Sequence, residues 1–96
     1  MKKEAFYTLV RDLETGSVKA MLRSGYTDGA FNYYKMNSKW FAIVPQYGLA
    51  LATAYTRKEA VKIAFNKLDK LEEYDKTNGE SMRNLFLEKA RQTATI

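Results

Sequence analysis

The chain has 96 residues, a formal net charge of +5 and 46% hydrophobic residues, and it contains neither cysteine nor histidine. This size and hydrophobic content predict a single domain over residues 1–96. Disulfides and thiolate-bound metals are excluded, and the commonest general base and metal ligand is missing. No apolar run approaches the ~20 residues of a membrane span, and the first residues lack the apolar stretch of a signal peptide, so we expect a cytoplasmic protein.

The first 55 residues alternate between runs rich in aromatic and β-branched residues and short turn-forming segments. We expect strands over residues 5–11, 17–23, 30–36, 40–44 and 49–55. Gly16 suits the left-handed position of the first turn. Residues 24–29 contain two glycines and predict a loop, whereas Asn37 and Ser38 form a short turn. Because the connections are mostly short, an antiparallel meander is favoured.

The fifth predicted strand alternates large and small residues, which indicates a period of two. Its small residues are Ala50, Ala52 and Ala54. This flat stripe allows another layer to approach closely, so we expect a helix over it. Thr56 followed by Glu59 fits a capping box, with Thr56 as the N-cap. The apolar residues that follow recur at the helical period and predict a helix over about residues 57–74.

A second helix is predicted over about residues 80–92, after a break at Thr77, Asn78 and Gly79. The expected fold is therefore α+β. An antiparallel sheet of about four to five strands, formed by residues 5–55, would be packed on one face by the two C-terminal helices.

Charge and aromatic residues are both concentrated toward the N-terminal side of the chain. Residues 1–62 contain ten Lys/Arg and five Asp/Glu, whereas residues 63–96 contain six of each. A sheet covered on one face can expose aromatic and basic side chains on the other, where rings stack on bases or on a protein partner and cations hold phosphates or acidic groups. The exposed tyrosines are expected to include Tyr7. The predicted partner-binding residues are Lys19, Arg23, Tyr33, Tyr34, Lys35, Lys39 and Tyr47. In the alternative interpretation, the rings fill the core and the lysines only maintain solubility.

No residue pattern indicates catalysis. The carboxylates gather in a predicted turn and at a predicted helix end, where solvation accounts for them, and no serine has a histidine to activate it. The glycines are dispersed and form no phosphate-cradling loop. We therefore expect no enzymatic activity, no cofactor and no metal.

One stretch, residues 38–64, resembles a pattern of small phage and mobile-element proteins. The residues that carry it are Lys39-Trp40-Phe41-Ala42-Ile43, Gly48-Leu49-Ala50-Leu51-Ala52 and Thr56-Arg57-Lys58-Glu59-Ala60. Their order of strand, turn, strand and helix is similar to that of phage host-takeover factors and anti-CRISPR inhibitors. The resemblance implies stoichiometric binding to a host macromolecule. Many such inhibitors are acidic mimics of nucleic acid, whereas this chain is basic and is better suited to guide RNA or an acidic protein patch.

Two functions therefore remain open from the sequence. The first is a non-enzymatic phage-type protein that inhibits a nucleic-acid-handling defence machine in the cytoplasm of a host cell. Its partner would be a host protein or ribonucleoprotein complex, with no membrane and no small-molecule substrate. The alternative is a nucleic-acid-binding module that uses a basic, aromatic face of the sheet.

Overall fold

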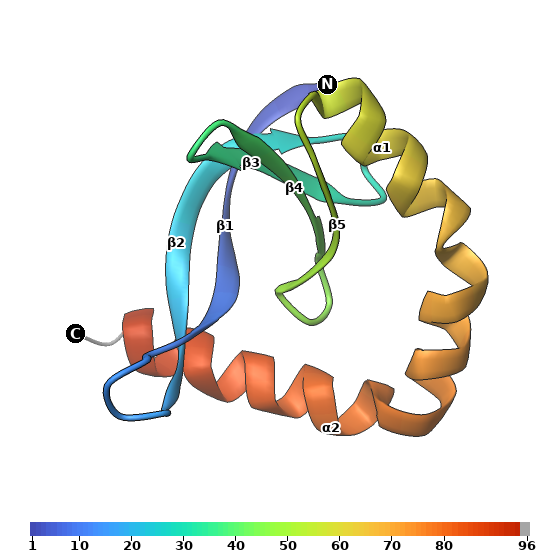
Figure 1. Ribbon diagram of the computed structural model, residues 1–96. Helices are drawn as coiled ribbons and strands as arrows, with labels where there is room; N and C mark the ends of the chain where they lie inside the picture. Colours follow the sequence, from blue (N-terminus) through green and yellow to red (C-terminus); the bar gives the residue numbers. More distant parts are fainter. Residues whose placement is uncertain (95–96) are drawn as a thin grey trace.

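The computed structural model describes residues 1–94, which form five strands followed by two helices (Figure 1). The strands are β1 (Lys2–Arg11), β2 (Val18–Thr27), β3 (Asn32–Met36), β4 (Lys39–Val44) and β5 (Leu49–Ala54). The helices are α1 (Arg57–Asn66) and α2 (Leu68–Ala94). All neighbouring strands pair antiparallel, in the order β1-β2-β3-β4-β5. The predicted α+β fold, with an antiparallel sheet before two helices, is confirmed.

The sheet divides into a long hairpin and a three-stranded part. Strands β1 and β2 pair along all ten residues of each, but β2 pairs with β3 only at its last two residues, Tyr26 and Thr27. Beyond that point the hairpin curves away from β3–β5 (Figure 1). Gly25 lies where the strands diverge, and a Cβ atom there would lie 2.0 Å from the carbonyl oxygen of Tyr33. Glycine is therefore needed for close backbone approach. The prediction of a loop over residues 24–29 was wrong for residues 24–27, which are strand.

The predicted turns form where the sequence placed them. Gly16 has a φ of 72°, in the left-handed region. Asn37 and Ser38 also have positive φ values, 53° and 65°, and they join β3 to β4 in a two-residue hairpin turn. Such a turn fixes the register of its two strands, so Lys35 lies directly opposite Trp40.

Strand β5 follows the predicted alternation only in part. Ala52 and Ala54 are buried in a core that includes residues of α1, as expected. Ala50 is exposed, because the register with β4 shifts at Leu51 and leaves that residue without an opposite partner. Such a bulge reverses the alternation of faces. Leu49 and Leu51 consequently pack against the helix-side core, contrary to the prediction that all three alanines share that side.

The first helix begins as predicted, but the two helices meet at a different place. The Thr56 hydroxyl accepts a hydrogen bond from the Glu59 amide at 3.1 Å, which makes Thr56 the N-cap of α1. The break lies at Lys67 and not at residues 77–79, and α2 runs without interruption through Gly79. The predicted bounds of 57–74 and 80–92 were therefore wrong. Gly79 leaves room for the ion pair between Asp75 and Arg83, which passes over it. A Cβ atom at Gly79 would lie 2.5 Å from the Asp75 carboxylate.

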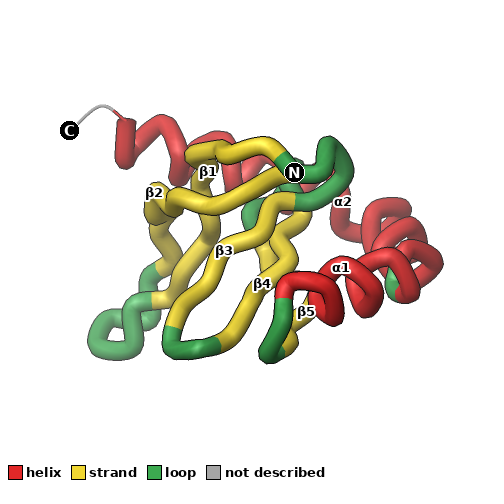
Figure 2. Tube along the Cα trace, turned by 90° about the horizontal axis from the view of Figure 1, so that it is seen from above, coloured by secondary structure: helices red, strands yellow, loops and turns green. Residues whose placement is uncertain are grey.

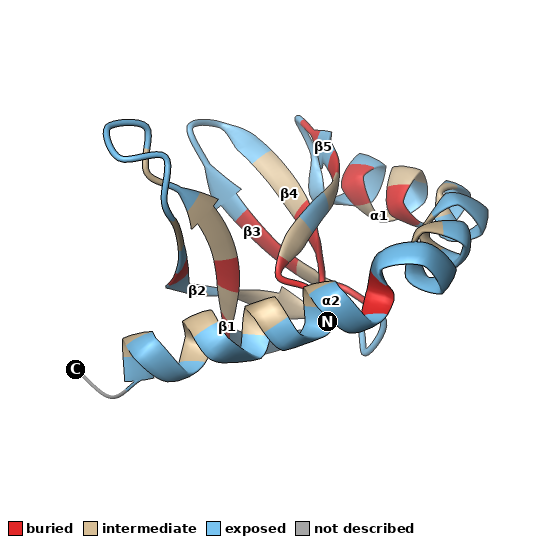
Figure 3. Cartoon of the chain, turned by 90° about the horizontal axis from the view of Figure 1, so that it is seen from below, coloured by how far each residue is buried: buried red, intermediate tan, exposed pale blue. Residues whose placement is uncertain are grey.

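Both faces of the sheet carry a hydrophobic core. On the helix side, a cluster joins the sheet to both helices, and it contains Phe31, Tyr33, Ala42, Val44, Tyr47, Ala52, Ala54, Ala60 and Ala64. The smaller cluster on the opposite face contains Phe6, Tyr34 and Ile43, with Phe41 packed against it. Figure 2 shows α1 alongside β5, and Figure 3 shows buried positions on β3, β4 and α1.

The second helix, α2, covers the part of the molecule formed by the β1–β2 hairpin. It runs beneath the β1–β2 hairpin, where the Thr93 hydroxyl donates to the carbonyl of Ala20 at 3.0 Å (Figure 1). The hairpin also contacts the β4–β5 turn through the Leu9 amide and the Gly48 carbonyl, 2.9 Å apart. Within residues 1–94, no helix combines the length and apolar composition that a membrane crossing requires.

Candidate functional site

Three of the tyrosines predicted to be exposed are buried. Tyr33 is 0% exposed, Tyr47 is 2% exposed and Tyr34 is 8% exposed, and Tyr7 is half-buried. The prediction of exposed rings at these positions was therefore wrong. A tyrosine can be buried when its hydroxyl finds a partner or its ring finds a stack. Each of these three has one, and each therefore contributes to the structure of the core.

Tyr33 is held by the loop between β2 and β3. Its hydroxyl donates to the carboxylate of Asp28 at 2.6 Å, and the same carboxylate accepts the amides of Ala30 and Phe31 at 2.9 and 2.8 Å. Partial burial alone would raise the pKa of Asp28, but these hydrogen bonds outweigh it and lower the pKa below its ordinary value. Burial and the bond to Asp28 together raise the pKa of Tyr33. Asp28 thus stays ionised and Tyr33 stays neutral, which fixes the loop.

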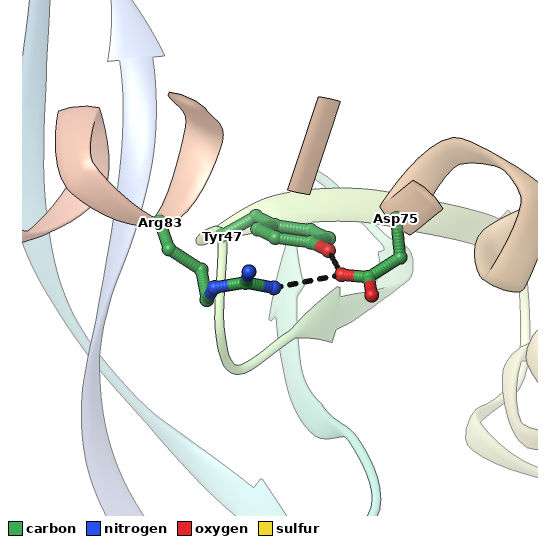
Figure 4. A network of polar contacts seen from close by, with 3 residues as sticks. All are labelled: Tyr47, Asp75 and Arg83. Atoms are coloured by element: carbon green, nitrogen blue, oxygen red, sulfur yellow. Dashed lines mark hydrogen bonds and ion pairs between the residues drawn. The ribbon is translucent and has the colours of Figure 1, made fainter. Parts of the chain in front are cut away.

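Tyr47 belongs to a polar network that attaches α2 to the β4–β5 turn. Its hydroxyl donates to the Asp75 carboxylate, which also accepts a hydrogen bond from the Arg83 guanidinium at 2.9 Å (Figure 4). The ring of Tyr47 meets that of Tyr74 edge-on, with centroids 5.7 Å apart. This network explains the burial of Tyr47 and its absence from the exposed surface.

Arg23 lies on the opposite face of the sheet from Tyr33. The register pairs Tyr26 with Tyr33, so Arg23 shares a face with Tyr34. Its guanidinium carbon lies 4.8 Å from the centre of the Tyr34 ring, and its Nε donates to the Thr8 hydroxyl at 3.3 Å. Arg23 is therefore half-buried in the gap between β2 and β3.

The predicted partner-binding residues consequently do not form one site. Lys19 is exposed at the hairpin end of β2, the opposite end from Tyr26. Lys35 and Lys39 are exposed at the turn between β3 and β4. Among the predicted residues, the structure brings Arg23 and Tyr34 into contact. It places Lys35 and Lys39 at the same end of the sheet but on opposite faces, beside residues that were not predicted from the sequence.

A cluster of cations and rings surrounds Lys35 and Lys39. The rings of Tyr26 and Trp40 lie 6.2 Å apart, and the guanidinium carbon of Arg57, the first residue of α1, lies 5.0 Å and 5.7 Å from their centres. We name this cluster the basic aromatic surface. Its members are Tyr26, Lys35, Lys39, Trp40, Tyr55 and Arg57.

Lys39 and Tyr55 extend the basic aromatic surface around the end of the sheet. The Lys39 ammonium lies 5.8 Å from the centre of the Tyr55 ring, which is 73% exposed. Lys35, Lys39 and Arg57 are exposed, and within the described part of the chain none of them forms an ion pair. Tyr26 and Trp40 are half-buried, so each ring is fixed by the sheet yet still reaches the surface.

One part of the basic aromatic surface, the pairing of Lys35 with Trp40, could be predicted from the sequence. A two-residue turn at Asn37 and Ser38 implies the register that sets Lys35 opposite Trp40. The position of Arg57 could not be predicted, because it depends on how α1 crosses the sheet.

Comparison of the chain with protein-family models, curated proteins and solved structures found no match. Among residues 1–94, no group of three or more acidic side chains is placed to hold a metal ion. The chemistry of the basic aromatic surface is therefore the basis for assigning a function. It offers fixed positive charge next to partly exposed rings, a combination suited to a polyanion with flat groups.

Proposed function

We propose that the protein is a non-enzymatic binding protein whose basic aromatic surface holds single-stranded nucleic acid. The observation that carries this proposal is the placement of Arg57 over both Tyr26 and Trp40, beside two lysines without acidic partners. Single-stranded nucleic acid presents phosphates and unstacked bases together, and proteins commonly bind it with cations and aromatic or guanidinium planes.

The division of roles follows from geometry. Lys35 and Lys39 carry exposed ammonium groups that can contact phosphates. The Tyr55 ring is exposed, and the Arg57 guanidinium offers a planar group for a base. Tyr26 and Trp40 stand on paired strands, so their rings lose little conformational freedom when a partner binds.

The distribution of charge supports this location. Five Lys/Arg in excess of Asp/Glu lie within residues 1–62, the part of the chain that contains the whole basic aromatic surface. An unbalanced positive region attracts polyanions and speeds their association at low salt. Charge alone would also attract acidic proteins, whereas the ordered rings favour a partner with stacking groups.

Binding of a labelled single-stranded oligonucleotide, followed by fluorescence anisotropy over a series of salt concentrations, tests this function. We expect affinity to fall with salt, and a Lys35→Glu, Lys39→Glu double variant to bind more weakly. Each lost phosphate contact reduces the slope of log affinity against log salt by about 0.7 for a single strand. The control is a Lys70→Glu, Lys76→Glu variant, which makes the same change of charge on α2. Equal binding by the two double variants would exclude the basic aromatic surface as the site.

The resemblance over residues 38–64 supports a second, more specific candidate. Lys39, Trp40 and Arg57 lie within that stretch, so the resembling segment and the basic aromatic surface overlap. Under this candidate the protein acts in the cytoplasm of a host cell, where it binds a nucleic-acid-handling defence complex stoichiometrically. A pull-down from host lysate, with and without nuclease, separates the candidates. A defined complex that survives nuclease favours an inhibitor, whereas loss of all partners after nuclease favours direct binding of nucleic acid.

A further inference from the structure

A cavity of about 320 Å³ lies between the β4–β5 hairpin and the junction of the two helices. Its walls are largely apolar, and they include Val44, Leu49, Leu51 and Leu71 together with the rings of Tyr47 and Tyr74. This volume is at the lower end of the range of about 300–1,000 Å³ for small-molecule sites. Its lining includes Lys67, at the break between the helices, and Leu51, at the bulge of β5, and the sequence alone indicates neither feature.

The charged groups of this cavity are both cations. Lys67 is half-buried, and its ammonium donates one hydrogen bond, to the carbonyl of Leu51 at 3.0 Å. An ammonium has three donors, and no carboxylate within residues 1–94 forms an ion pair with it. Lys70 contributes a second, more exposed ammonium to the lining. Positive charge next to apolar walls favours a ligand that has an anionic group and an apolar part.

The cavity at Lys67 has no acidic lining residue, whereas a neighbouring cavity has two. This neighbouring cavity of about 480 Å³ also touches Val44, Tyr47 and Leu71, but its charged lining residues are Glu72, Asp75 and Arg83. Asp75 is already occupied by Tyr47 and Arg83 (Figure 4). The carboxylates therefore leave the positive charge of Lys67 uncompensated in the first cavity.

We propose that the cavity at Lys67 binds a small organic carboxylate with an apolar body, such as a medium-chain aliphatic acid. The carboxylate accepts hydrogen bonds from the Lys67 ammonium, with Lys70 adding charge from the rim. The aliphatic part lies against Leu49, Leu71 and the ring of Tyr74. A charge-assisted hydrogen bond and buried apolar area would together give the affinity. This site is separate from the basic aromatic surface.

Isothermal titration with decanoate, kept below its micelle concentration, tests the proposal, with decyltrimethylammonium as a probe of equal chain length and opposite charge. We expect saturable binding of decanoate at one site and at least tenfold weaker binding of the cation. Lys67→Gln should weaken decanoate binding about tenfold or more, whereas Lys62→Gln, an exposed position on α1 outside the cavity, should leave it unchanged.

A second variant guards against a general loss of structure in Lys67→Gln. Leu49 is half-buried, packs against the helix-side core and lines the cavity, so Leu49→Trp should fill part of the space without removing the lysine. It should weaken decanoate binding at least tenfold while the protein keeps a cooperative melting transition. The proposal is overturned if decanoate fails to bind, if both probes bind equally, or if Leu49→Trp binds decanoate as the wild type does.

Discussion

The guanidinium carbon of Arg57 lies 5.7 Å from the centre of the Trp40 ring, so the first residue of α1 covers a ring presented by β4. Thr56 caps the helix and thereby makes Arg57 its first residue, whereas the placement of Arg57 over the ring depends on how α1 crosses the sheet. The basic aromatic surface is thus built from the junction of strand and helix that the sequence marks most clearly.

The β4–β5 turn should be sensitive to a side chain at Gly48. This residue has a φ of 67°, and a Cβ atom there would lie 2.4 Å from the Phe86 ring of α2. We expect Gly48→Ala to cost clearly more than the roughly 1–2 kcal/mol of a left-handed alanine. Gly16→Ala is the matched control, because its φ is 72° and nothing lies within 4 Å of its added Cβ. Chemical denaturation of both variants measures the difference, and equal losses would argue against the contact with Phe86.

The contact between β5 and α1 should distinguish two alanines in the same strand. Ala52 is 4% exposed and packs in the core shared with α1, whereas Ala50 is exposed. Ala52→Leu should overpack this core and cost about 1–3 kcal/mol of unfolding free energy. Ala50→Leu should change stability by less than about 0.5 kcal/mol. Denaturation midpoints compared at constant slope provide the measurement, and a neutral Ala52→Leu would contradict the layer order.

Stability should fall in acid because of Asp28. The pKa of Asp28 is lowered in the folded protein, so its contribution is fully present above the unfolded value of about 3.9 and is lost as pH falls through the folded value. Asp28→Asn should therefore reduce stability near neutral pH and flatten its dependence on pH below about 4. Melting curves between pH 2 and pH 7 would show this, with Glu80→Gln as an exposed control. A parallel pH dependence in the wild type and Asp28→Asn would refute the role of this carboxylate.

Local patterns predicted the elements that local forces determine. Thr56 with Glu59 marked the start of α1, and Asn37 with Ser38 marked a tight turn, because caps and turns depend on a few adjacent residues. Gly79 was misread as a helix breaker. It leaves room for the ion pair of Asp75 with Arg83, which meet across it only in the folded helix.

The candidate site was predictable only in part, for a related reason. Tyr33 and Tyr34 are adjacent and chemically alike, and they fill cores on opposite faces because both sides of the sheet carry one. Composition cannot reveal that second core. Lys35 and Lys39 were selected from their charge, whereas the grouping of rings with Arg57 depends on tertiary packing.

Trp40 is the only tryptophan in the chain and belongs to the basic aromatic surface, so its fluorescence reports directly on the proposed site. A titration with single-stranded oligonucleotide at low salt should change Trp40 emission saturably, and added salt should reverse the change. Arg57→Glu should largely abolish it, while Lys76→Glu, an equal change of charge on α2, should preserve it at an unchanged melting temperature. Trp40 emission that does not respond to the oligonucleotide, or responds equally in the Arg57→Glu variant, would contradict binding at this surface.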